Sequence, residues 1–430
     1  MSRWANKYVI GLTGNIAMGK SLVRKMLEHL GAYTIDADGL AHQVMVPGAP
    51  AYGPVIETFG KWILDSQNRV DRAKLGAVVF AHPEALARLE ALTHPIVGQG
   101  IDTLITRAKQ PIVVIEAIKL LEGALADQVD AIWVVDTAPQ IQYDRLVKKR
   151  GMSEYEARKR IDTQNPQRIK LARASVVITN NGSPDDVWVQ VQREWNKILT
   201  QRHVADRGDE YHTVSVGQQP AATPAAPAPV ARPAPAPTVA PAPAPAAMPT
   251  PAPAPAPSAP APTAVPTTIT RLGIRRGMPK NAEQISALLN QSLSKNLSHN
   301  DIMIAFGEKS YLLADVEGKT VGLVGFQVEN LITRVDEFVI VPGAPVAPVA
   351  EGLIGAVEEA SKELQSEVGF IFLPLTANDV AKAFIDQGYE LMTLESIKVP
   401  AWREAAAESQ PPDTQILAKK LRAERVLKPL

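Results

Sequence analysis

Cysteine is absent from this chain of 430 residues, and aromatic residues make up only 5% of it. Without cysteine there is no disulfide framework, no thiolate nucleophile and no cysteine-ligated metal site. Charge of one sign is not in excess, since 45 basic residues stand against 45 acidic ones, so neither nucleic acid nor an anionic membrane is an expected partner. No apolar run is long enough to span a membrane, and the first residues lack the pattern of a secretory signal. We therefore expect a cytoplasmic protein.

Proline is abundant, and its distribution divides the chain. Of the 47 residues from Pro220 to Pro266, 37 are alanine or proline. Such a run has no residues from which to build a core, and proline removes backbone donors, so it predicts a spacer with polyproline II character. A spacer of this kind separates two bodies without orienting them. The segments we expect are a first domain at 1–205, a disordered linker at 206–267, a second domain at 268–405 and a tail at 406–430.

The first segment begins with a short apolar run, a glycine-containing turn and a helix. The run and the turn extend from Lys7 to Gly19, and apolar residues then recur at helical spacing. The turn fits G-x-x-x-x-G-K-[ST], which between a strand and a helix is typical of a phosphate-binding loop. The residues of this predicted nucleotide site are Gly14, Asn15, Ile16, Ala17, Met18, Gly19, Lys20, Ser21 and Leu22.

Each part of this loop has an expected task. Backbone N–H groups from Ile16 to Ser21 would surround a β-phosphate at the positive end of the helix, and Lys20 would reach the β- and γ-phosphates. Ser21 would bind Mg²⁺, so ATP and Mg are the expected cofactors. Ala17 stands where glycine is usual, and its preference for negative φ would impair the approach of the backbone to a phosphate. The alternative is a glycine turn that only caps a helix.

Two carboxylates follow the second predicted strand. Asp36 and Asp38 lie where an open α/β sheet binds its ligands, near the carboxyl ends of the strands. One of them could accept a proton from a substrate hydroxyl while a phosphoryl group is transferred in line. Alternatively, both cap a helix that begins at Leu40.

Seven motifs in order resemble the dephospho-coenzyme A kinase family over residues 7–199. They are GLTGNIAMGKS, TIDADGLAHQVMVPGAPAYGPVIETFG, VDRAKLGAVVF, LTHPIV, LLEGALAD, VVDTAPQIQYDRLVKKRGMSEYEARKRIDTQ and ASVVITNNG. The resemblance implies an α/β fold, namely a P-loop kinase with a parallel sheet, a helical acceptor-binding subdomain and a lid. It also implies the reaction, which is transfer of phosphate from ATP to the ribose 3′-hydroxyl of dephospho-coenzyme A.

The resemblance assigns roles to individual residues. Asp38 would be the base and Asp36 its structural partner, and Asp38, Lys20 and Arg145 form the predicted catalytic set. Arg145 and Lys149 match basic residues of the lid, which we expect as a helical stretch at 139–163.

The resemblance assigns less specific roles to several other positions. Asn180 would belong to the loop that brackets adenine. The acceptor subdomain would span residues 47–94 and end at the histidine of a His-Pro signature, a residue that is more often structural than catalytic. Glu122 matches a family glutamate, whereas Ile118 and Lys119 stand where the family more often has Pro-Leu, which puts the placement of the acceptor in doubt.

The second domain has a different resemblance. Its expected order, β-α-β-β-β-α-β-α-β with a last strand at 389–399, resembles the GNAT acetyltransferase superfamily. Members hold the pyrophosphate of acetyl-coenzyme A on free N–H groups where a long helix begins, but Pro348 has no N–H, and Phe384 stands where many members have a tyrosine. We therefore expect a binding or assembly module of unknown ligand, without acetyl transfer. The tail is either an amphipathic helix that contacts a partner or a frayed terminus.

Three functions stand at this point. The favoured one is an ATP-dependent kinase whose substrate is dephospho-coenzyme A, and the alternatives are a bifunctional kinase and acyltransferase or a degenerate P-loop scaffold. A scaffold would have no reason to keep Lys20, Ser21 and Asp38 together.

Overall fold

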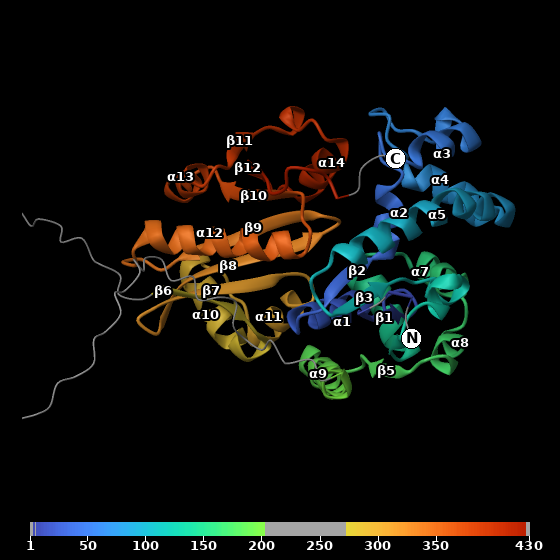
Figure 1. Ribbon diagram of the computed structural model, residues 1–430, viewed down its shortest axis with the longest axis horizontal. Coiled ribbons are helices and arrows are strands. Elements are labelled where there is room, and N and C mark those ends of the chain that lie inside the picture. The colour runs from blue at the N-terminus through green and yellow to red at the C-terminus, as the bar shows by residue number, and fades with distance from the viewer. Residues whose placement is uncertain (1–2, 5, 203–271, 427–430) are drawn as a thin grey trace, which may run out of the picture.

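Two α/β bodies make up the part of the chain that the structure describes. The computed structural model describes residues 3–4, 6–202 and 272–426, and the predicted linker at 206–267 lies outside them. One body contains a parallel sheet and the other a mostly antiparallel sheet (Figure 1). Among the described residues, no helix combines the length and the apolar character needed to cross a membrane.

The five strands of the first sheet are all parallel and lie in the order β2-β3-β1-β4-β5. They are β1 (Tyr8–Thr13), β2 (Tyr33–Asp36), β3 (Ile112–Glu116), β4 (Ala131–Asp136) and β5 (Val176–Thr179). β3 and β4 are apolar and buried almost throughout, because helices cover both faces of the sheet. The carboxyl ends of parallel strands lie at one edge, so the loops after β1, β2 and β3 meet there.

Helices of the first domain cover both faces of this sheet. The apolar sides of α1 and α9 pack on one face, and α5 packs on the other together with the small helices of the acceptor subdomain. The helical elements up to the third strand are α1 (Lys20–His29), α2 (Ala37–Gln43), α3 (Tyr52–Phe59), η1 (Lys61–Ile63), α4 (Arg72–Ala81) and α5 (Pro83–Arg107). Those that follow are η2 (Leu120–Glu122), η3 (Ala124–Asp127), α6 (Pro139–Asp144), η4 (Arg145–Lys149), α7 (Glu154–Asp162), α8 (Gln167–Ala172) and α9 (Pro184–Arg202).

The predicted lid at 139–163 is helical but interrupted. α6 continues into η4, a π-helix, and the helix then stops before α7. Gly151, in the break, has a φ of +64°, a conformation that ends a right-handed helix. Ser153 then caps α7 in a capping box with Glu156. The expected helical stretch is therefore present but divided into α6, η4 and α7, because these local signals interrupt it.

The second sheet has seven strands in the order β11-β12-β10-β9-β8-β7-β6. The strands are β6 (Leu272–Gly277), β7 (Ser310–Val316), β8 (Lys319–Glu329), β9 (Ile332–Ile340), β10 (Val368–Pro374), β11 (Glu390–Met392) and β12 (Thr414–Lys420). The helical elements are η5 (Pro279–Asn281), α10 (Ala282–Leu293), α11 (His299–Ala305), α12 (Val346–Glu363), α13 (Asn378–Asp386), η6 (Leu394–Ser396) and α14 (Pro400–Ser409).

The C-terminal part of this domain differs from the prediction. The strand expected at 389–399 is reduced to the three residues of β11 and is followed by η6. Residues 414–420 of the tail form neither a helix nor a frayed terminus, because as β12 they insert between β10 and β11, antiparallel to both. Ile416, Leu417 and Ala418 are all buried, as in a strand covered on both faces. The domain therefore does not end at residue 405.

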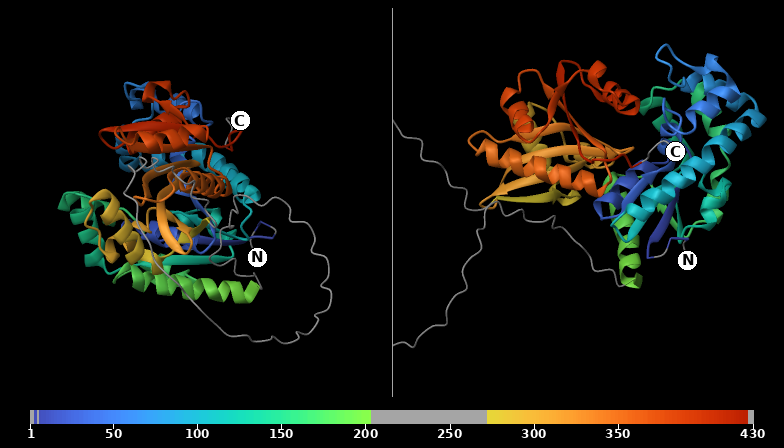
Figure 2. Two further views of the ribbon diagram at one scale, coloured as in Figure 1. Left: turned by 90° about the vertical axis from the view of Figure 1, so that its left-hand side faces the viewer. Right: turned by 45° about the horizontal axis from the view of Figure 1, so that its top comes forward.

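The two bodies are in direct contact, so their orientation does not depend on the spacer (Figure 2). Leu331 and Val426 of the second body are buried in the apolar core of the first. Polar contacts accompany this burial: Gln365 Nε2 donates to the carbonyl oxygen of Leu104 at 2.8 Å, and the imidazole of His29 donates to the carbonyl oxygen of Phe306 at 3.0 Å. The expectation that the spacer leaves the two bodies unoriented is thus corrected.

His29 makes this interface sensitive to pH. Burial lowers the pKa of His29 to about 4, so the imidazole is neutral in the folded protein while it is protonated below its ordinary pKa of 6.5 when unfolded. Between these values the unfolded state binds the extra proton, and stability falls as the pH falls. We expect the free energy of unfolding to drop by about 2 kcal/mol from this residue between pH 7 and pH 5. Chemical denaturation at both pH values measures it.

The matched variants separate His29 from other titrating groups. His29→Gln should lose this contribution to the pH dependence, and His82→Gln, at an exposed position, should keep it. An identical pH dependence in the wild type and His29→Gln would contradict the assignment.

Candidate active site

The predicted phosphate-binding loop connects β1 to α1 at the carboxyl edge of the sheet. Gly19 precedes the helix with a φ of +101°, and a Cβ there would lie 2.0 Å from Asn180 Nδ2, so only glycine fits. Asn180 Nδ2 donates to the carbonyl oxygen of Met18 at 2.9 Å. The loop that follows β5 therefore holds the backbone of the phosphate-binding loop in place.

Ala17 has a φ of +60°, in the left-handed region that its side chain disfavours. Because glycine adopts this conformation without strain, Ala17→Gly should not destabilise the protein and should raise the free energy of unfolding by up to about 1 kcal/mol. Ala77→Gly, in the exposed interior of α4, is the control and should lower it by about 0.5–1 kcal/mol. Equal losses in chemical denaturation of the two variants would show that Ala17 is unstrained.

Lys20 is the first residue of α1 and is only 7% exposed. Burial lowers the pKa of its ammonium group, while the charges of Glu116, Asp38 and Asp36 raise it and that of Arg150 lowers it. A lysine of a phosphate-binding loop is expected in an exposed position, but Lys20 is buried among side chains at the carboxyl ends of β2 and β3. Its charge lies close to three carboxylates and is largely shielded from solvent.

Ser21, in the first turn of α1, and Glu116, the last residue of β3, are brought together by the fold. Ser21 Oγ donates to Glu116 Oε1 at 3.2 Å, and Glu116 Oε2 accepts from Arg24 Nε at 2.7 Å. Glu116 was missed from the sequence, although a carboxylate that ends a buried apolar strand beside the loop strand is a usable signal. Leu22 has another environment, since its side chain packs against Gly307 of the second domain.

The two aspartates after β2 have separate roles. Asp36 is the N-cap of α2, which begins at Ala37 and not at Leu40, and its Oδ1 accepts from Gly39 N at 2.9 Å. Asp38 Oδ2 instead accepts from the backbone N–H of Ile118 at 3.0 Å. Burial raises the pKa of Asp38, a shift that this hydrogen bond and Lys20 reduce. Only Asp36 acts as a cap, and Asp38 faces the site.

The departure from the family pattern at Ile118 provides a hydrogen-bond donor for Asp38. A proline has no N–H, so the donor to Asp38 exists because isoleucine stands here. The neighbouring Lys119 bridges Glu90 at 2.7 Å and Glu122 at 3.8 Å.

The basic residues of the lid lie at different distances from the loop. Arg145 Nη1 donates to the carbonyl oxygens of Ala17 and Met18 at 3.3 Å, and its Nη2 donates to the Asn180 carbonyl oxygen at 2.9 Å. Lys149 is exposed. Arg150, which follows it, is close enough for its charge to lower the pKa of Lys20. Arg145 is thus the lid residue whose guanidinium group contacts the loop.

Two glutamines, one between α7 and α8 and one at the start of α8, contact the loop and were missed from the sequence. Gln164 Oε1 accepts from Ile16 N at 2.8 Å, and Gln167 Oε1 accepts from Asn15 N at 3.1 Å. Amide side chains of this kind give no periodic signal, so only the fold reveals the contact. The N–H group of Ile16, predicted to face a phosphate, donates to Gln164 in this structure.

Lys170 of α8 is a further group that the sequence did not single out. Its Nζ donates to the carbonyl oxygen of Ile118 at 2.6 Å. Burial, together with the charge of Lys20, lowers the pKa of Lys170 to about 8. Lys170 therefore places an ammonium group near Asp38, in addition to that of Lys20.

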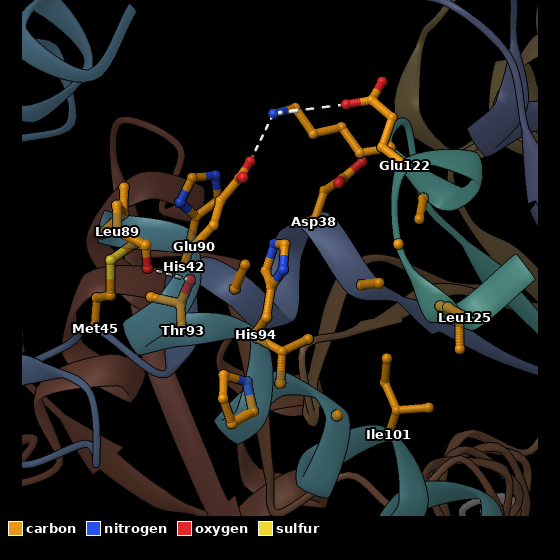
Figure 3. A pocket seen from close by; sticks show the side chains of 18 of the residues that line it. Asp38, His42, Met45, Leu89, Glu90, Thr93, His94, Ile101, Glu122 and Leu125 are labelled. Atoms are coloured by element: carbon orange, nitrogen blue, oxygen red, sulfur yellow. Dashed lines mark hydrogen bonds and ion pairs between the residues drawn. The ribbon is translucent and has the colours of Figure 1, made fainter. Parts of the chain in front are cut away.

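A cavity of about 800 Å³ opens beside Asp38, between α2, α4 and α5 (Figure 3). Asp38, His42 and His94 line it, and Figure 3 shows Asp38 and His94 pointing into it. Its wall is largely apolar and includes residues whose apolar spacing predicts a helix core. Leu75 and Val79 are buried, in agreement with that prediction. Phe80, which also lines the cavity, is 80% exposed, so for this residue the prediction is wrong.

Aromatic side chains fill part of the core of the second domain. β9 and β10 pair only from Ile332–Val335 to Val368–Ile371 and then separate. An edge-to-face stack of aromatic rings, with centroids 5.1 Å apart, occupies the adjoining core and consists of Phe338, Phe384 and Tyr389. Pro348 lies in the first turn of α12, where it offers no N–H group.

A parallel sheet, a phosphate-binding loop with a buried lysine, and a carboxylate beside a large cavity together define a P-loop kinase that acts on a small molecule. The family model described as "Dephospho-CoA kinase" matches residues 8–186. Dephospho-CoA kinase of Geobacter sulfurreducens is 39% identical over 192 residues, which are 44% of this chain and 98% of that protein. The enzyme of Thermobifida fusca is 39% identical over 195 residues, with 45% and 98% covered.

The chain belongs to the dephospho-CoA kinase family. It is an enzyme that phosphorylates dephospho-coenzyme A to coenzyme A, with ATP as the phosphate donor. This outcome confirms the favoured function, and it does not favour the bifunctional alternative.

Solved structures are similar to each part of the chain. A dephospho-CoA kinase from Campylobacter jejuni is 26% identical, with a TM-score of 0.36, and the alignment covers 46% of this chain and 99% of that one. An acetyltransferase of the GNAT family from Streptococcus pneumoniae is 16% identical, with a TM-score of 0.28, and 35% and 99% are covered.

Proposed function

We propose that Asp38 is the base of the kinase reaction and that the cavity beside it receives dephospho-coenzyme A. The observation that carries this proposal is the position of Asp38, which lines the cavity and is also close enough to Lys20 for each charge to shift the pKa of the other. An acceptor hydroxyl in the cavity would thus lie between a carboxylate and the phosphate-binding loop. The raised pKa makes Asp38 a stronger base than an exposed aspartate.

The reaction follows from this arrangement. The ribose 3′-hydroxyl oxygen attacks the γ-phosphorus, Asp38 takes the hydroxyl proton, and the bond from the γ-phosphorus to the bridging oxygen of ATP breaks, which releases ADP. Lys20 stabilises the negative charge on the phosphoryl oxygens, and Arg145 supplies a second cation from the lid. The Ile118 N–H keeps the carboxylate of Asp38 aimed into the cavity.

We infer that Mg²⁺ accompanies ATP, held by Ser21 and near Glu116. The hydroxyl and carboxylate oxygens are hard donors, which suit this ion. The described residues contain no group of three or more histidine, cysteine or carboxylate side chains that could hold a metal by themselves. This agrees with Mg²⁺, which binds through one or two protein oxygens together with phosphates and water. When bound, Mg²⁺ neutralises charge that develops on the phosphates.

The proposal extends to the chain as a whole. We divide it into a kinase domain before the linker and a second domain without acetyl transfer, in a protein whose lack of cysteine fits the cytoplasm. The test is to incubate purified protein with ATP, Mg²⁺ and dephospho-coenzyme A and to measure coenzyme A. Omission of Mg²⁺ should remove turnover. Turnover that persists in the presence of a chelator would refute the proposed role of Mg²⁺. Acetyl transfer to any amine of a test panel would refute the proposal that the second domain lacks this activity.

A further inference from the structure

The second domain contacts the kinase domain along α1, the helix whose N-terminus follows the phosphate-binding loop. At the C-terminal end of α1, Arg276 Nη1 donates to the carbonyl oxygens of Glu28 and His29 at 3.3 and 3.2 Å. A cation is favourable there because the last carbonyl groups of a helix carry partial negative charge. Near the first turn, Leu22 packs against Gly307. The second domain therefore holds both ends of this helix.

Arg24, in the middle of α1, connects the two domains. Its Nε donates to Glu116 Oε2 at 2.7 Å, and its Nη2 donates to Glu329 Oε1 of the second domain at 3.4 Å. Arg24 is buried, and although burial lowers its pKa, the charges of Glu116, Glu28 and Glu329 raise it above its ordinary value. A buried guanidinium has fixed donor directions, so the carboxylates around it determine where it lies.

Glu329 stands at the tip of the hairpin formed by β8 and β9. The two turn residues Asn330 and Leu331 have φ values of +52° and +65°, a conformation that is uncommon for leucine. The carbonyl oxygen of Asn330 accepts from Gln43 Nε2 at 2.7 Å, while Leu331 is buried in the kinase core. Strain of this kind persists where the surroundings hold it. Docking on the kinase domain thus fixes the tip.

Glu329 is also anchored from its own domain. Its Oε2 accepts from Arg334 Nη2 at 3.0 Å, and Arg334 Nη1 donates to Ser409 Oγ at 2.6 Å, at the end of α14. One carboxylate therefore lies between a guanidinium of each domain. Charge-assisted hydrogen bonds of this kind restrict geometry more than neutral ones do.

The chain of contacts ends at the nucleotide site. Glu116, which Arg24 orients, accepts from the hydroxyl of Ser21. A serine hydroxyl has one proton and two lone pairs, so the partner of the proton decides where the lone pairs point. A carboxylate of the second domain can therefore influence a group in the phosphate-binding loop through two intermediate side chains.

We propose that Glu329 is a positioning residue of the kinase reaction: by holding Arg24, and through it Glu116, it orients the hydroxyl of Ser21 toward the metal–nucleotide complex. The proposal rests on the proposed role of Ser21 in binding Mg²⁺. The curated relatives are matched over 98% of their length by the kinase domain, so Glu329 belongs to a part of this chain that they do not match. The second domain then sets the affinity of the kinase for Mg·ATP.

The experiment compares Glu329→Gln with Glu317→Gln in the full chain. Glu317 precedes β8 at its opposite end and is exposed, so its variant removes the same charge away from the kinase domain. Glu329→Gln should raise the dissociation constant of Mg·ATP, measured by titration calorimetry without acceptor, and the apparent KM for Mg·ATP, each about three- to tenfold. The kcat and the KM for dephospho-coenzyme A should change less than about twofold. Glu329→Asp, which keeps the charge, should recover part of the change. Glu317→Gln should match the wild type.

A double variant tests the route. In a Ser21→Ala background, Glu329→Gln should cause no further rise in the KM for Mg·ATP, because the group through which it acts is gone. A rise that persists there, an equal rise in Glu317→Gln, or a normal KM in Glu329→Gln would each overturn the proposal. If Ser21→Ala alone left the KM unchanged, the proposed role of Ser21 would fail first and the proposal with it, which is a distinct result.

Discussion

Asp38→Asn should lower kcat by about 10²–10⁴-fold while ATP binding persists. The amide cannot take the proton of the 3′-hydroxyl, yet its oxygen can still accept from the N–H of Ile118, so the site should keep its shape. Since burial raises the pKa of Asp38, wild-type kcat/KM should also fall with decreasing pH, starting at a higher pH than for an exposed aspartate. Steady-state kinetics and nucleotide titration measure both effects.

Asp36→Asn is the matched control for this variant. Asparagine caps helices as well as aspartate, so α2 should keep its N-cap bond to Gly39 and turnover should fall less than about tenfold. If the two variants lost activity equally, or if Asp38→Asn turned over normally, the assignment of the base to Asp38 would be wrong.

Lys20→Ala should lower kcat by about 10²–10⁴-fold, and it should not lower the stability of the protein in the absence of nucleotide. The ammonium group stabilises the negative charge on the transferred phosphoryl group. In the protein without nucleotide, burial disfavours the charged form of Lys20, as its lowered pKa shows. The melting temperature without nucleotide should therefore stay the same or rise. Calorimetry and steady-state kinetics on the same preparation test this.

Lys25 offers a contrast on the same helix. It is also buried, but its Nζ pairs with Glu28 at 2.7 Å on the side of α1 away from the loop. Lys25→Met leaves a buried carboxylate without this partner and should cost about 3 kcal/mol of stability, with kcat of the folded protein little changed. A Lys20→Ala variant that behaved like Lys25→Met would show that Lys20 is structural.

Part of the candidate site was predictable because its signals are local. The strand, turn and helix around Gly19 and Lys20 follow from spacing within a few residues, and so does the carboxylate pair after β2. The division of labour within that pair was not predictable from spacing alone. It depends on Ile118, far along the chain, whose N–H reaches Asp38 only after β2 and β3 have paired.

The fold of the second domain shows the same limit. Most of its strands and helices were predicted from their apolar patterns, but β12 was expected in a helical or frayed tail. Its residues gain a strand conformation because β10 and β11 supply backbone partners on both sides. Hydrogen bonds between distant segments leave no periodic trace in a short apolar run.

The sequence by itself determined the phosphate-binding loop, the pair of aspartates after β2 and the order of strands and helices in the kinase domain. It also determined the family of the kinase. Each of these conclusions rests on motifs whose residues lie close together in the chain. Only the tertiary structure decided that Lys20 is buried, that Glu116 meets Ser21, and that a hairpin of the second domain carries Glu329 to Arg24. The last two contacts join residues that are 95 and 305 positions apart. Their geometry follows from how sheets and domains pack, which no local pattern encodes.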